Sequence, residues 1–382
     1  MRCPWLTVVL AAAVFTVGVV ADEGPAAALT ARLETLAAGG AIPGFAVAIV
    51  TADGVAYQHG FGYAELARRV PYTTETIQPV ASVSKTVIGV CLMKAVEQGR
   101  AELDAPLGSV VGVPVAHPRY PERPLTLRQL ATHTSGIRDV DSLYRRAYVP
   151  GDVPNRPLAE YLKDYLAPVG EPPLRGAAFT RAAPGASFVY TNVGAALAAQ
   201  AIGERVGIEF AAYSAEVVFA PLGMTDTSWR VDPAKESRRA TLYGPGGRAL
   251  SPYTLVTYPD GGLRTTCRDL AQYLVEILRG HGGRGRLLSP ASYAELLRPQ
   301  FGPASMPEGF STKEPNSALF WMLSRSGGLG HTGGDPGVTA IVAFNPGSGL
   351  GRLFIANIDV DEAPAAEKQM AAVWQALGEW PR

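Results

Sequence analysis

Two apolar hairpins at opposite ends of the chain constrain the fold more than any other feature of the sequence. In each hairpin, two short apolar runs flank a turn, Asp53-Gly54 in the first and residues 345–349 in the second. A helical pattern precedes the first hairpin and another follows the second. The expected strands are 45–50, 55–59, 338–344 and 353–358, and the expected helices are 26–37 and about 364–378. These elements predict one antiparallel sheet that is built from both chain ends and flanked by helices.

The middle of the chain, residues 95–255, has a different character. Short helical patterns such as 127–133 and 194–206 alternate there with proline-rich loops. The sequence therefore predicts an α+β fold in which an all-helical lobe is inserted into a lobe that contains the sheet. We place the α/β lobe at 22–94 and 256–382 and the mostly helical lobe at 95–255, with the default site in the crevice between them.

The first residues have the pattern of a secretory signal peptide. A short basic start is followed by an uncharged run from Trp5 to Ala21, which ends on a small residue. We therefore predict that residues 1–21 are a signal peptide and that the protein is exported to the periplasm or the extracellular space. The alternative is an uncleaved membrane anchor, for which the apolar run is at the lower limit of length. Only in that case would the protein contact a membrane.

The charge balance and the histidine and cysteine content limit the kinds of ligand and partner that the protein can bind. The 34 basic residues balance the 34 acidic ones, and no basic cluster is interleaved with aromatic residues. The sequence therefore favours a small neutral or weakly charged partner and no nucleic acid. It has no CxxC or HExxH spacing and its five histidines are scattered, so we expect no metal and no cofactor. Cys91 and Cys267 would remain after cleavage, and their wide separation leaves a disulfide open.

A lysine in an apolar segment is the first candidate for chemistry. Lys85 is the only charged residue between Glu75 and Lys94, and an unpaired buried ammonium is costly. The chain has six lysines against 28 arginines. A lysine at this position is therefore informative, because arginine cannot release its proton near neutral pH.

Ser82 lies three residues before this lysine. Side chains three residues apart meet on one face of a helix, whereas Ser84 points elsewhere. An amine in apolar surroundings can remove the proton of a serine hydroxyl, because burial disfavours the charged form of the amine. The pair of Ser82 and Lys85 therefore indicates a serine nucleophile that a lysine activates. The alternative is a lysine that extends to solvent from the edge of a core helix.

Two later stretches add polar groups to this pair. Tyr190-Thr191-Asn192 precedes an alanine-rich helix, and residues 328–334 precede the second hairpin. Tyr190 can carry the serine proton to a leaving group and Asn192 can hold the lysine and a substrate amide. Alternatively, Tyr190 is a core aromatic residue and Asn192 is the helix cap. Glycines on an edge strand leave the backbone open to a substrate, but they are also turn residues, and a lone histidine such as His331 is commonly structural.

Together these stretches resemble a known family. Ser82-Val83-Ser84-Lys85, Tyr190-Thr191-Asn192 and His331-Thr332-Gly333 are similar, in this order, to the three motifs of the serine β-lactamase and penicillin-binding-protein superfamily. The likeness is to its class C β-lactamase, DD-peptidase and esterase branch and covers about residues 27–380. The supporting stretches that also resemble this branch are 42–44, 125–136, 221–224 and 261–263.

The resemblance implies a β-lactamase/transpeptidase-like fold and a role for each motif residue. Ser82 would attack a carbonyl carbon and form an acyl-enzyme, while Lys85 and Tyr190 exchange its proton. The backbone N–H groups of Ser82 and Gly334 would form the oxyanion hole. The residues that would line the substrate face are Asn192, His331, Thr332, Gly333 and Gly334.

The sequence departs from class C β-lactamases in two places. Those enzymes have a lysine where His331 stands, and they place asparagine and arginine, which help hold the carboxylate of the drug, where residues 357–365 are acidic. Carboxylates at that position would repel an anion. We therefore expect an exported serine hydrolase for esters or amides, esterase-like first, D-amino-acid-peptidase-like second and β-lactamase third.

Two other function classes are compared with this hypothesis. A non-catalytic descendant that binds peptidoglycan or assembles with itself remains the alternative, although the intact serine and lysine argue against it. A Ser-His-Asp hydrolase of the α/β-hydrolase type is excluded, because the chain has no G-x-S-x-G stretch. His133, in one of the supporting stretches, is interpreted as structural.

Overall fold

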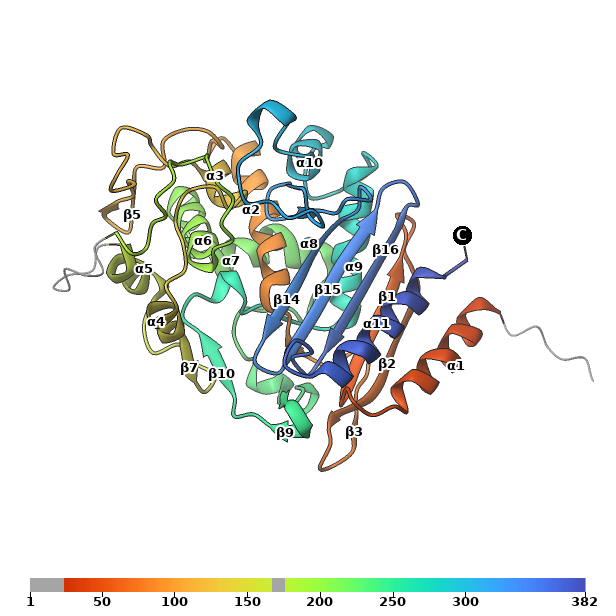
Figure 1. Cartoon of the computed structure of the whole chain (residues 1–382). Coiled ribbons are helices and arrows are strands. Elements are labelled where there is room, and N and C mark those ends of the chain that lie inside the picture. The colour runs from red at the N-terminus through yellow and green to blue at the C-terminus, as the bar shows by residue number, and fades with distance from the viewer. Residues whose placement is uncertain (1–23, 167–175, 382) are drawn as a thin grey trace, which may run out of the picture.

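An antiparallel sheet forms one side of the molecule (Figure 1). The computed structural model describes residues 24–166 and 176–381, so the predicted signal peptide, residues 1–21, lies outside the described residues. The strand order of the sheet is β12-β13-β14-β15-β16-β1-β2-β3. The strands are β12 (Asn316–Ser317), β13 (Met322–Leu323), β14 (Leu329–Asp335), β15 (Val338–Asn345), β16 (Leu350–Ala356), β1 (Gly44–Val50), β2 (Val55–Glu65) and β3 (Val70–Pro71).

The two ends of the chain meet at the centre of this sheet. β1 pairs with β16 along its length, from Phe45 opposite Ala356 to Val50 opposite Gly351. All seven residues of β1 are buried, because both faces of the sheet are covered. Alternate side chains of β1 belong to two separate hydrophobic clusters, one on each face. This explains the uninterrupted apolar run of the segment and confirms the predicted α+β fold with a sheet from both ends.

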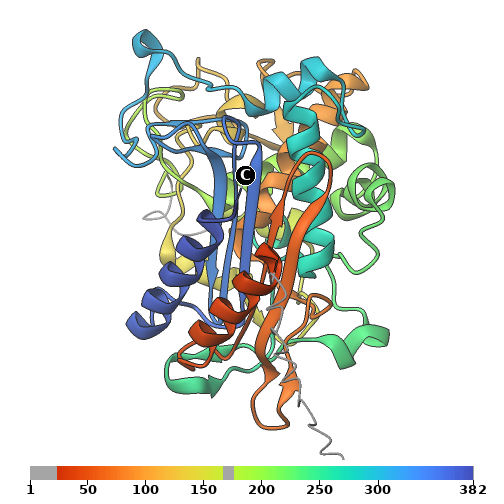
Figure 2. The same ribbon diagram turned by 90° about the vertical axis from the view of Figure 1, so that its right-hand side faces the viewer.

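Helices cover both faces of the sheet. α1 (Pro25–Ala37) and α11 (Pro364–Gly378) lie side by side on one face, as the turned view in Figure 2 shows. α9 (Cys267–His281) packs against β1, β2 and β16 on the opposite face. α10 (Pro290–Leu297) packs against both α9 and α2 (Ser84–Glu97). The bounds of α1 and α11 agree with the helices predicted at 26–37 and 364–378.

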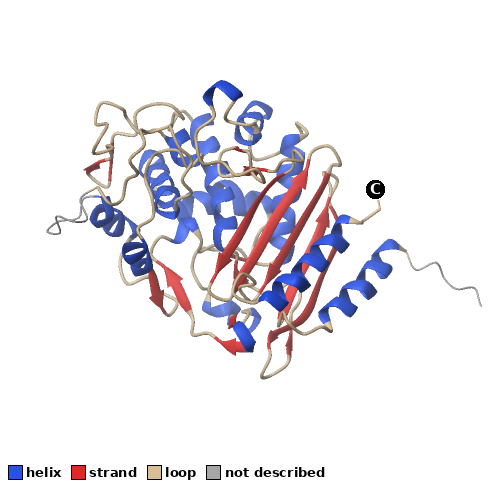
Figure 3. Ribbon diagram, in the orientation of Figure 1, coloured by secondary structure: helices blue, strands red, loops and turns tan. Residues whose placement is uncertain are grey.

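The remaining helices gather beyond the face that α9 covers (Figure 3). They are α3 (Leu127–Ala131), α4 (Asp141–Tyr144), α5 (Leu158–Leu166), α6 (Asn192–Val206), α7 (Phe210–Ser214) and α8 (Ala220–Leu222). α6 is apolar on all sides and buried from Val193 to Ala199, whereas its last turns carry the polar residues Gln200, Glu204 and Arg205. The division of the chain into lobes at residues 94/95 and 255/256 stays a prediction.

The middle region differs from the predicted all-helical lobe in one detail. It contains short two-stranded pairs, in which tight turns and bends bring extended residues together. The described pairs in this region are β5 (Ser109–Val110) with β6 (Val113–Pro114), β7 (Tyr148–Pro150) with β10 (Tyr253–Leu255), and β8 (Tyr243–Gly244) with β9 (Arg248–Ala249). A further short pair, β4 (Gln78–Pro79) with β11 (Arg264–Thr265), lies outside it. These pairs connect loops and do not extend the main sheet.

Two properties of the described chain bear on the sequence predictions. Among residues 24–166 and 176–381, no helix combines the length and the apolar character needed to cross a membrane. Within the same ranges Cys91 and Cys267 are buried and form no disulfide. Burial raises the pKa of both thiols, so neither is a reactive nucleophile.

Candidate active site

Ser82 and Lys85 lie where a 3₁₀ turn passes into a helix. The sequence predicts one helix that starts near Ser82, whereas the structure has a 3₁₀ turn η1 (Ala81–Val83) followed by α2 from Ser84. Lys85 is fully buried, and its Nζ lies 2.9 Å from Ser82 Oγ. Ala81, directly before the serine, has a φ of +45°, which is uncommon for a residue with a side chain and concentrates at functional sites. The structure therefore brings the predicted pair together.

Two further oxygen atoms hold the lysine amine. Lys85 Nζ donates to Asn192 Oδ1 at 2.7 Å and to the backbone oxygen of Asp260 at 2.5 Å. The ring centroid of Tyr190 lies 5.1 Å from Nζ, and Tyr190 is 37% exposed. Among the described residues its hydroxyl makes no hydrogen bond to Ser82 or to Lys85. An amine that is held this close to a serine hydroxyl can take the hydroxyl proton and return it.

Asp139 positions Asn192, a role that the sequence does not indicate. The Asp139 carboxylate accepts hydrogen bonds from the backbone N–H of Asn192 at 2.8 Å and from Asn192 Nδ2 at 2.9 Å. It also accepts from the Val193 N–H and the Thr191 hydroxyl. With Nδ2 turned to Asp139, Asn192 Oδ1 faces Lys85. The cap of α6 is Thr191, so Asn192 is not the helix cap that the structural alternative expected.

We expect Asp139→Ala to lower activity through Asn192. The substitution removes four hydrogen bonds, and we expect about a 10- to 100-fold loss of ester hydrolysis together with a destabilisation of about 1–3 kcal/mol. Hydrolysis rates and thermal unfolding would measure the two effects. Asp141→Ala is the matched control, because Asp141 is exposed and two residues away. Equal effects of both substitutions would contradict the positioning role.

Two histidines flank Tyr190. The His133 ring packs against Tyr190 at 4.4 Å between centroids and a tilt of 32°, and its Nδ1 accepts from the Thr191 N–H at 3.3 Å. This packing agrees with the structural interpretation of His133. His331 is 6% exposed and its Nδ1 lies 2.7 Å from the Thr332 oxygen, so that nitrogen carries the proton. Burial lowers the pKa of His331 to about 4, and the ring is therefore neutral at pH 7.

The strand β14 passes directly beside the Ser82 turn. A Cβ at Gly333 would lie 2.4 Å from the Val80 oxygen and 3.0 Å from the Ser82 nitrogen, so a side chain has no room there. β14 is not an edge strand along its whole length, because β13 pairs with it at Leu329 and Gly330. The backbone from 331 to 335 has β15 as its partner on one side only. The predicted open backbone is thus confined to this part of β14.

We expect Gly333→Ala to push β14 away from the Ser82 turn. Both clashing atoms belong to the backbone and cannot rotate away, so we expect a loss of about 1–3 kcal/mol in stability and a large loss of ester hydrolysis. Gly334→Ala is the matched control for stability, since its Cβ would meet only Asp361 Oδ2, at 3.8 Å. Thermal unfolding of the two variants should differ clearly. Equal stability would contradict the close contact of β14 and η1.

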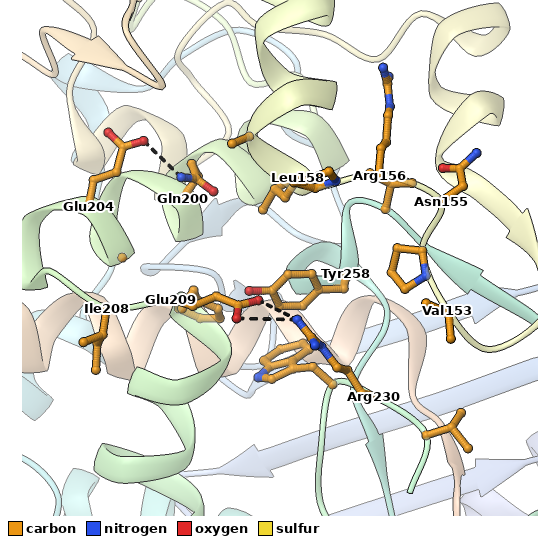
Figure 4. Close-up of a pocket in the computed structure, with 18 of the residues that line it drawn as sticks. Val153, Asn155, Arg156, Leu158, Gln200, Glu204, Ile208, Glu209, Arg230 and Tyr258 are labelled. Carbon is orange, nitrogen blue, oxygen red and sulfur yellow. Dashed lines mark hydrogen bonds and ion pairs between the residues drawn. The ribbon is translucent and has the colours of Figure 1, made fainter. Parts of the chain in front are cut away.

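A cleft in the described chain lies away from these residues (Figure 4). It has a volume of about 1040 Å³ and is lined by residues 152–159, the end of α6 and residues 229–231. Its Glu209 and Arg230 pair with each other. None of the predicted site residues lines it. Within residues 24–166 and 176–381 no group of three His, Cys, Asp or Glu side chains is arranged to hold a metal ion.

A large antiparallel sheet, helices on both of its faces and a serine–lysine pair beside one strand together define a β-lactamase/transpeptidase-like protein. Comparison with family models agrees with this class, because the model described as Beta-lactamase matches residues 29–375. The chain belongs to the Beta-lactamase family, a family of serine hydrolases. The family resemblance that the three sequence motifs carry is therefore confirmed.

Known relatives and solved structures support this assignment. The chain is 27% identical over 206 residues to the D-alanyl-D-alanine-carboxypeptidase/endopeptidase AmpH of Escherichia coli strain K12. The matched residues are 53% of this chain and 49% of AmpH. The chain thus spans about half the length of such curated relatives. A class C β-lactamase structure has a TM-score of 0.71 at 18% identity and covers 94% of this chain and 99% of its own. The D-amino acid amidase from Ochrobactrum anthropi SV3 has a TM-score of 0.68 at 21% identity, and the match covers 92% of this chain and 99% of the amidase. Both likenesses show the fold alone.

Proposed function

We propose that this protein is a serine hydrolase that forms an acyl-enzyme at Ser82 with small esters or amides. The observation that carries the proposal is the 2.9 Å contact between Ser82 Oγ and the buried Lys85 Nζ. Lys85 takes the hydroxyl proton while Oγ bonds to the carbonyl carbon, and Tyr190 delivers a proton to the leaving group as its bond breaks. A water molecule then attacks the acyl carbon and gives a proton to the Tyr190 oxygen. The bond from Oγ to the acyl carbon breaks, Oγ takes its proton back from Lys85, and the acid is released.

The backbone beside Ser82 supports an oxyanion hole. The proposed donors are the N–H groups of Ser82 and Gly334, which would stabilise the negative charge on the carbonyl oxygen. The contact of Gly333 with the Ser82 turn supports this arrangement, because it holds the two backbone segments together. The residues proposed to line the substrate face are Asn192, His331, Thr332 and Gly333.

The charge of the site supports the order of substrates. Asp361 Oδ2 lies 3.8 Å from the position of a Cβ on Gly334, which points to the face of β14 opposite that of Gly333, so a carboxyl group lies beside this part of the strand. A substrate with a carboxylate near this point is repelled. We therefore rank an ester first, a D-amino-acid peptide second and a β-lactam third. The name of the AmpH relative supports the peptide, as a carboxypeptidase and endopeptidase.

Export remains part of the proposal and rests on the sequence of residues 1–21. If the signal peptide is cleaved after Ala21, the exported protein begins at Asp22. Sequencing the N-terminus of the protein from the exported fraction tests this. A protein that keeps residues 1–21 in a membrane fraction would support the anchor alternative.

Hydrolysis of a substrate panel tests the proposed activity. The panel contains short-chain p-nitrophenyl esters, a peptide ending in D-alanyl-D-alanine and a chromogenic cephalosporin. We expect turnover to decrease in this order and to disappear in Ser82→Ala. Turnover that survives this substitution would remove Ser82 from its role. If no substrate is turned over and no covalent serine probe reacts, the non-catalytic alternative is favoured.

A further inference from the structure

The side chain of Asp335 faces the same region as the catalytic serine. His331, Gly333 and Asp335 alternate along β14 and point to one face of the strand. Gly333 on this face contacts the Ser82 turn. The position of a Cβ on Gly261 lies 3.3 Å from Asp335 Oδ2 and 3.8 Å from the carbonyl carbon of Ala81, the residue before Ser82. The carboxyl group of Asp335 therefore lies beside the turn that holds the nucleophile.

Asp335 has one oxygen atom without a hydrogen-bond partner among the described residues. The Tyr148 hydroxyl donates a hydrogen bond to Asp335 Oδ1. In the part of the chain that the structure describes, Oδ2 accepts no hydrogen bond and Asp335 takes part in no ion pair within 4.0 Å. Burial raises the pKa of Asp335 to about 6. The carboxyl group is therefore mostly ionised at pH 7, with one oxygen left for a ligand.

A second carboxyl group and three tyrosine rings lie next to Asp335, and we call this set of five residues the acidic wall. Asp260 is 1% exposed, and its Oδ1 accepts a hydrogen bond from the Tyr144 hydroxyl at 3.2 Å. Its buried Oδ2 has no hydrogen-bond partner in the described residues. The rings of Tyr144 and Tyr148 pack at 5.8 Å, and those of Tyr148 and Tyr253 at 5.7 Å. Because burial raises the pKa of Asp260 to about 8, that group is mostly neutral at pH 7, and Asp335 supplies the negative charge. A carboxylate together with tyrosine faces and hydroxyls is a set of groups that binds an ammonium ion.

The acidic wall lies where the acyl group of a substrate would bind, and not where its leaving group would depart. The Tyr190 ring lies 6.2 Å from the His331 ring, at one end of the open backbone of β14. Asp335 lies at the other end of that backbone, next to Gly334. A leaving group that takes its proton from Tyr190 departs at the first end, so the acyl group extends toward Asp335.

We propose that Asp335 selects substrates whose acyl group carries a free ammonium close to the reacting carbonyl, such as esters or amides of amino acids with an unblocked amine. The inference rests on the proposed acyl-enzyme at Ser82. Asp335 Oδ2 accepts a hydrogen bond from the ammonium, and the tyrosine hydroxyls and rings surround it. An acyl group with a carboxylate at this position is disfavoured for the same reason.

A matched pair of substrates tests the selection. Phenylalanine p-nitroanilide, as the D and L forms, is compared at pH 7 with 3-phenylpropanoic acid p-nitroanilide, which lacks only the ammonium. For at least one enantiomer we expect kcat/KM about tenfold or more above that of the neutral compound, as for a charged hydrogen bond. In Asp335→Asn this ratio should fall about tenfold. The ratio is internal to each protein, so a general loss of activity cancels.

Controls separate this inference from the proposed function. Asp53→Asn should keep the ratio, because the Asp53 side chain is 87% exposed in the turn between β1 and β2, where it pairs with Arg284. Labelling of Asp335→Asn by a fluorophosphonate reports that the serine site is assembled. If that variant does not fold, inhibition of ester hydrolysis in the unaltered protein tests the ammonium selection instead. 2-Phenylethylamine should then inhibit about tenfold more strongly than 2-phenylethanol.

The outcomes are distinguishable. Ser82-dependent hydrolysis with a ratio at or below one for both enantiomers would overturn the ammonium selection and leave the serine hydrolase intact. An unchanged ratio in a folded Asp335→Asn would do the same, as would equal inhibition by the amine and the alcohol. If neither the esters nor the anilides are turned over and the fluorophosphonate does not react, the proposed function and the selection both fail.

Discussion

Replacement of Ser82 by alanine is expected to abolish hydrolysis of p-nitrophenyl esters. Without Oγ no acyl-enzyme forms, and removal of a nucleophile of this kind lowers kcat by about four orders of magnitude or more. The fold should persist, because the described contacts of the Ser82 side chain reduce to the hydrogen bond from Lys85. Initial rates and thermal unfolding on the same preparations measure both effects.

A second serine serves as control for this result. Ser326 is exposed, and within the described ranges its side chain bonds only to Ser324, so Ser326→Ala should keep the activity of the unaltered protein. A Ser82→Ala protein that retains more than about a tenth of the original rate would show that another group is the nucleophile.

Replacement of Lys85 by methionine is expected to have the second largest effect. The substitution keeps an unbranched side chain but removes the amine that lies 2.9 Å from Ser82 Oγ. A positioned general base contributes about 10²- to 10⁴-fold, and we expect a loss in that range. Asn192 Oδ1 and the Asp260 oxygen lose their donor as well, and an unsatisfied buried acceptor costs about 1–3 kcal/mol.

A lysine on the same helix provides the matched control. Lys94 also belongs to α2, but its side chain is 30% exposed and its Nζ donates to the Leu287 oxygen at 2.8 Å. Lys94→Met should therefore lower stability slightly and leave the rate of ester hydrolysis nearly unchanged. If Lys85→Met kept the rate while its stability fell, the lysine would be a structural residue of the α2 core and not a general base.

Local patterns predict much of this fold. The helix expected at 364–378 is α11 (Pro364–Gly378), and the strand expected at 45–50 is β1 (Gly44–Val50). Both depend on short-range regularities, a helical apolar period in one and an apolar run beside a turn in the other. The pair of Ser82 and Lys85 is predictable for the same reason, because their contact spans a single turn.

Long-range contacts explain what the sequence does not predict. Asp139 is separated by more than fifty residues from the Asn192 that it orients, and no spacing rule connects them. Asp260 stands in a turn with two glycines after it, and nothing local shows that its backbone oxygen meets Lys85. The pairing of β13 with β14 arises from a short strand of two residues. Such features depend on where distant segments pack and not on local pattern.

Covalent labelling tests the central claim most directly. The purified protein is incubated with a fluorophosphonate, its intact mass is measured and the modified residue is located by peptide sequencing. Our account predicts one adduct per chain, on Ser82, with little or none in Ser82→Ala and a much slower reaction in Lys85→Met. An adduct on another serine, or equal labelling of the unaltered protein and Lys85→Met, would contradict a lysine-activated nucleophile at Ser82.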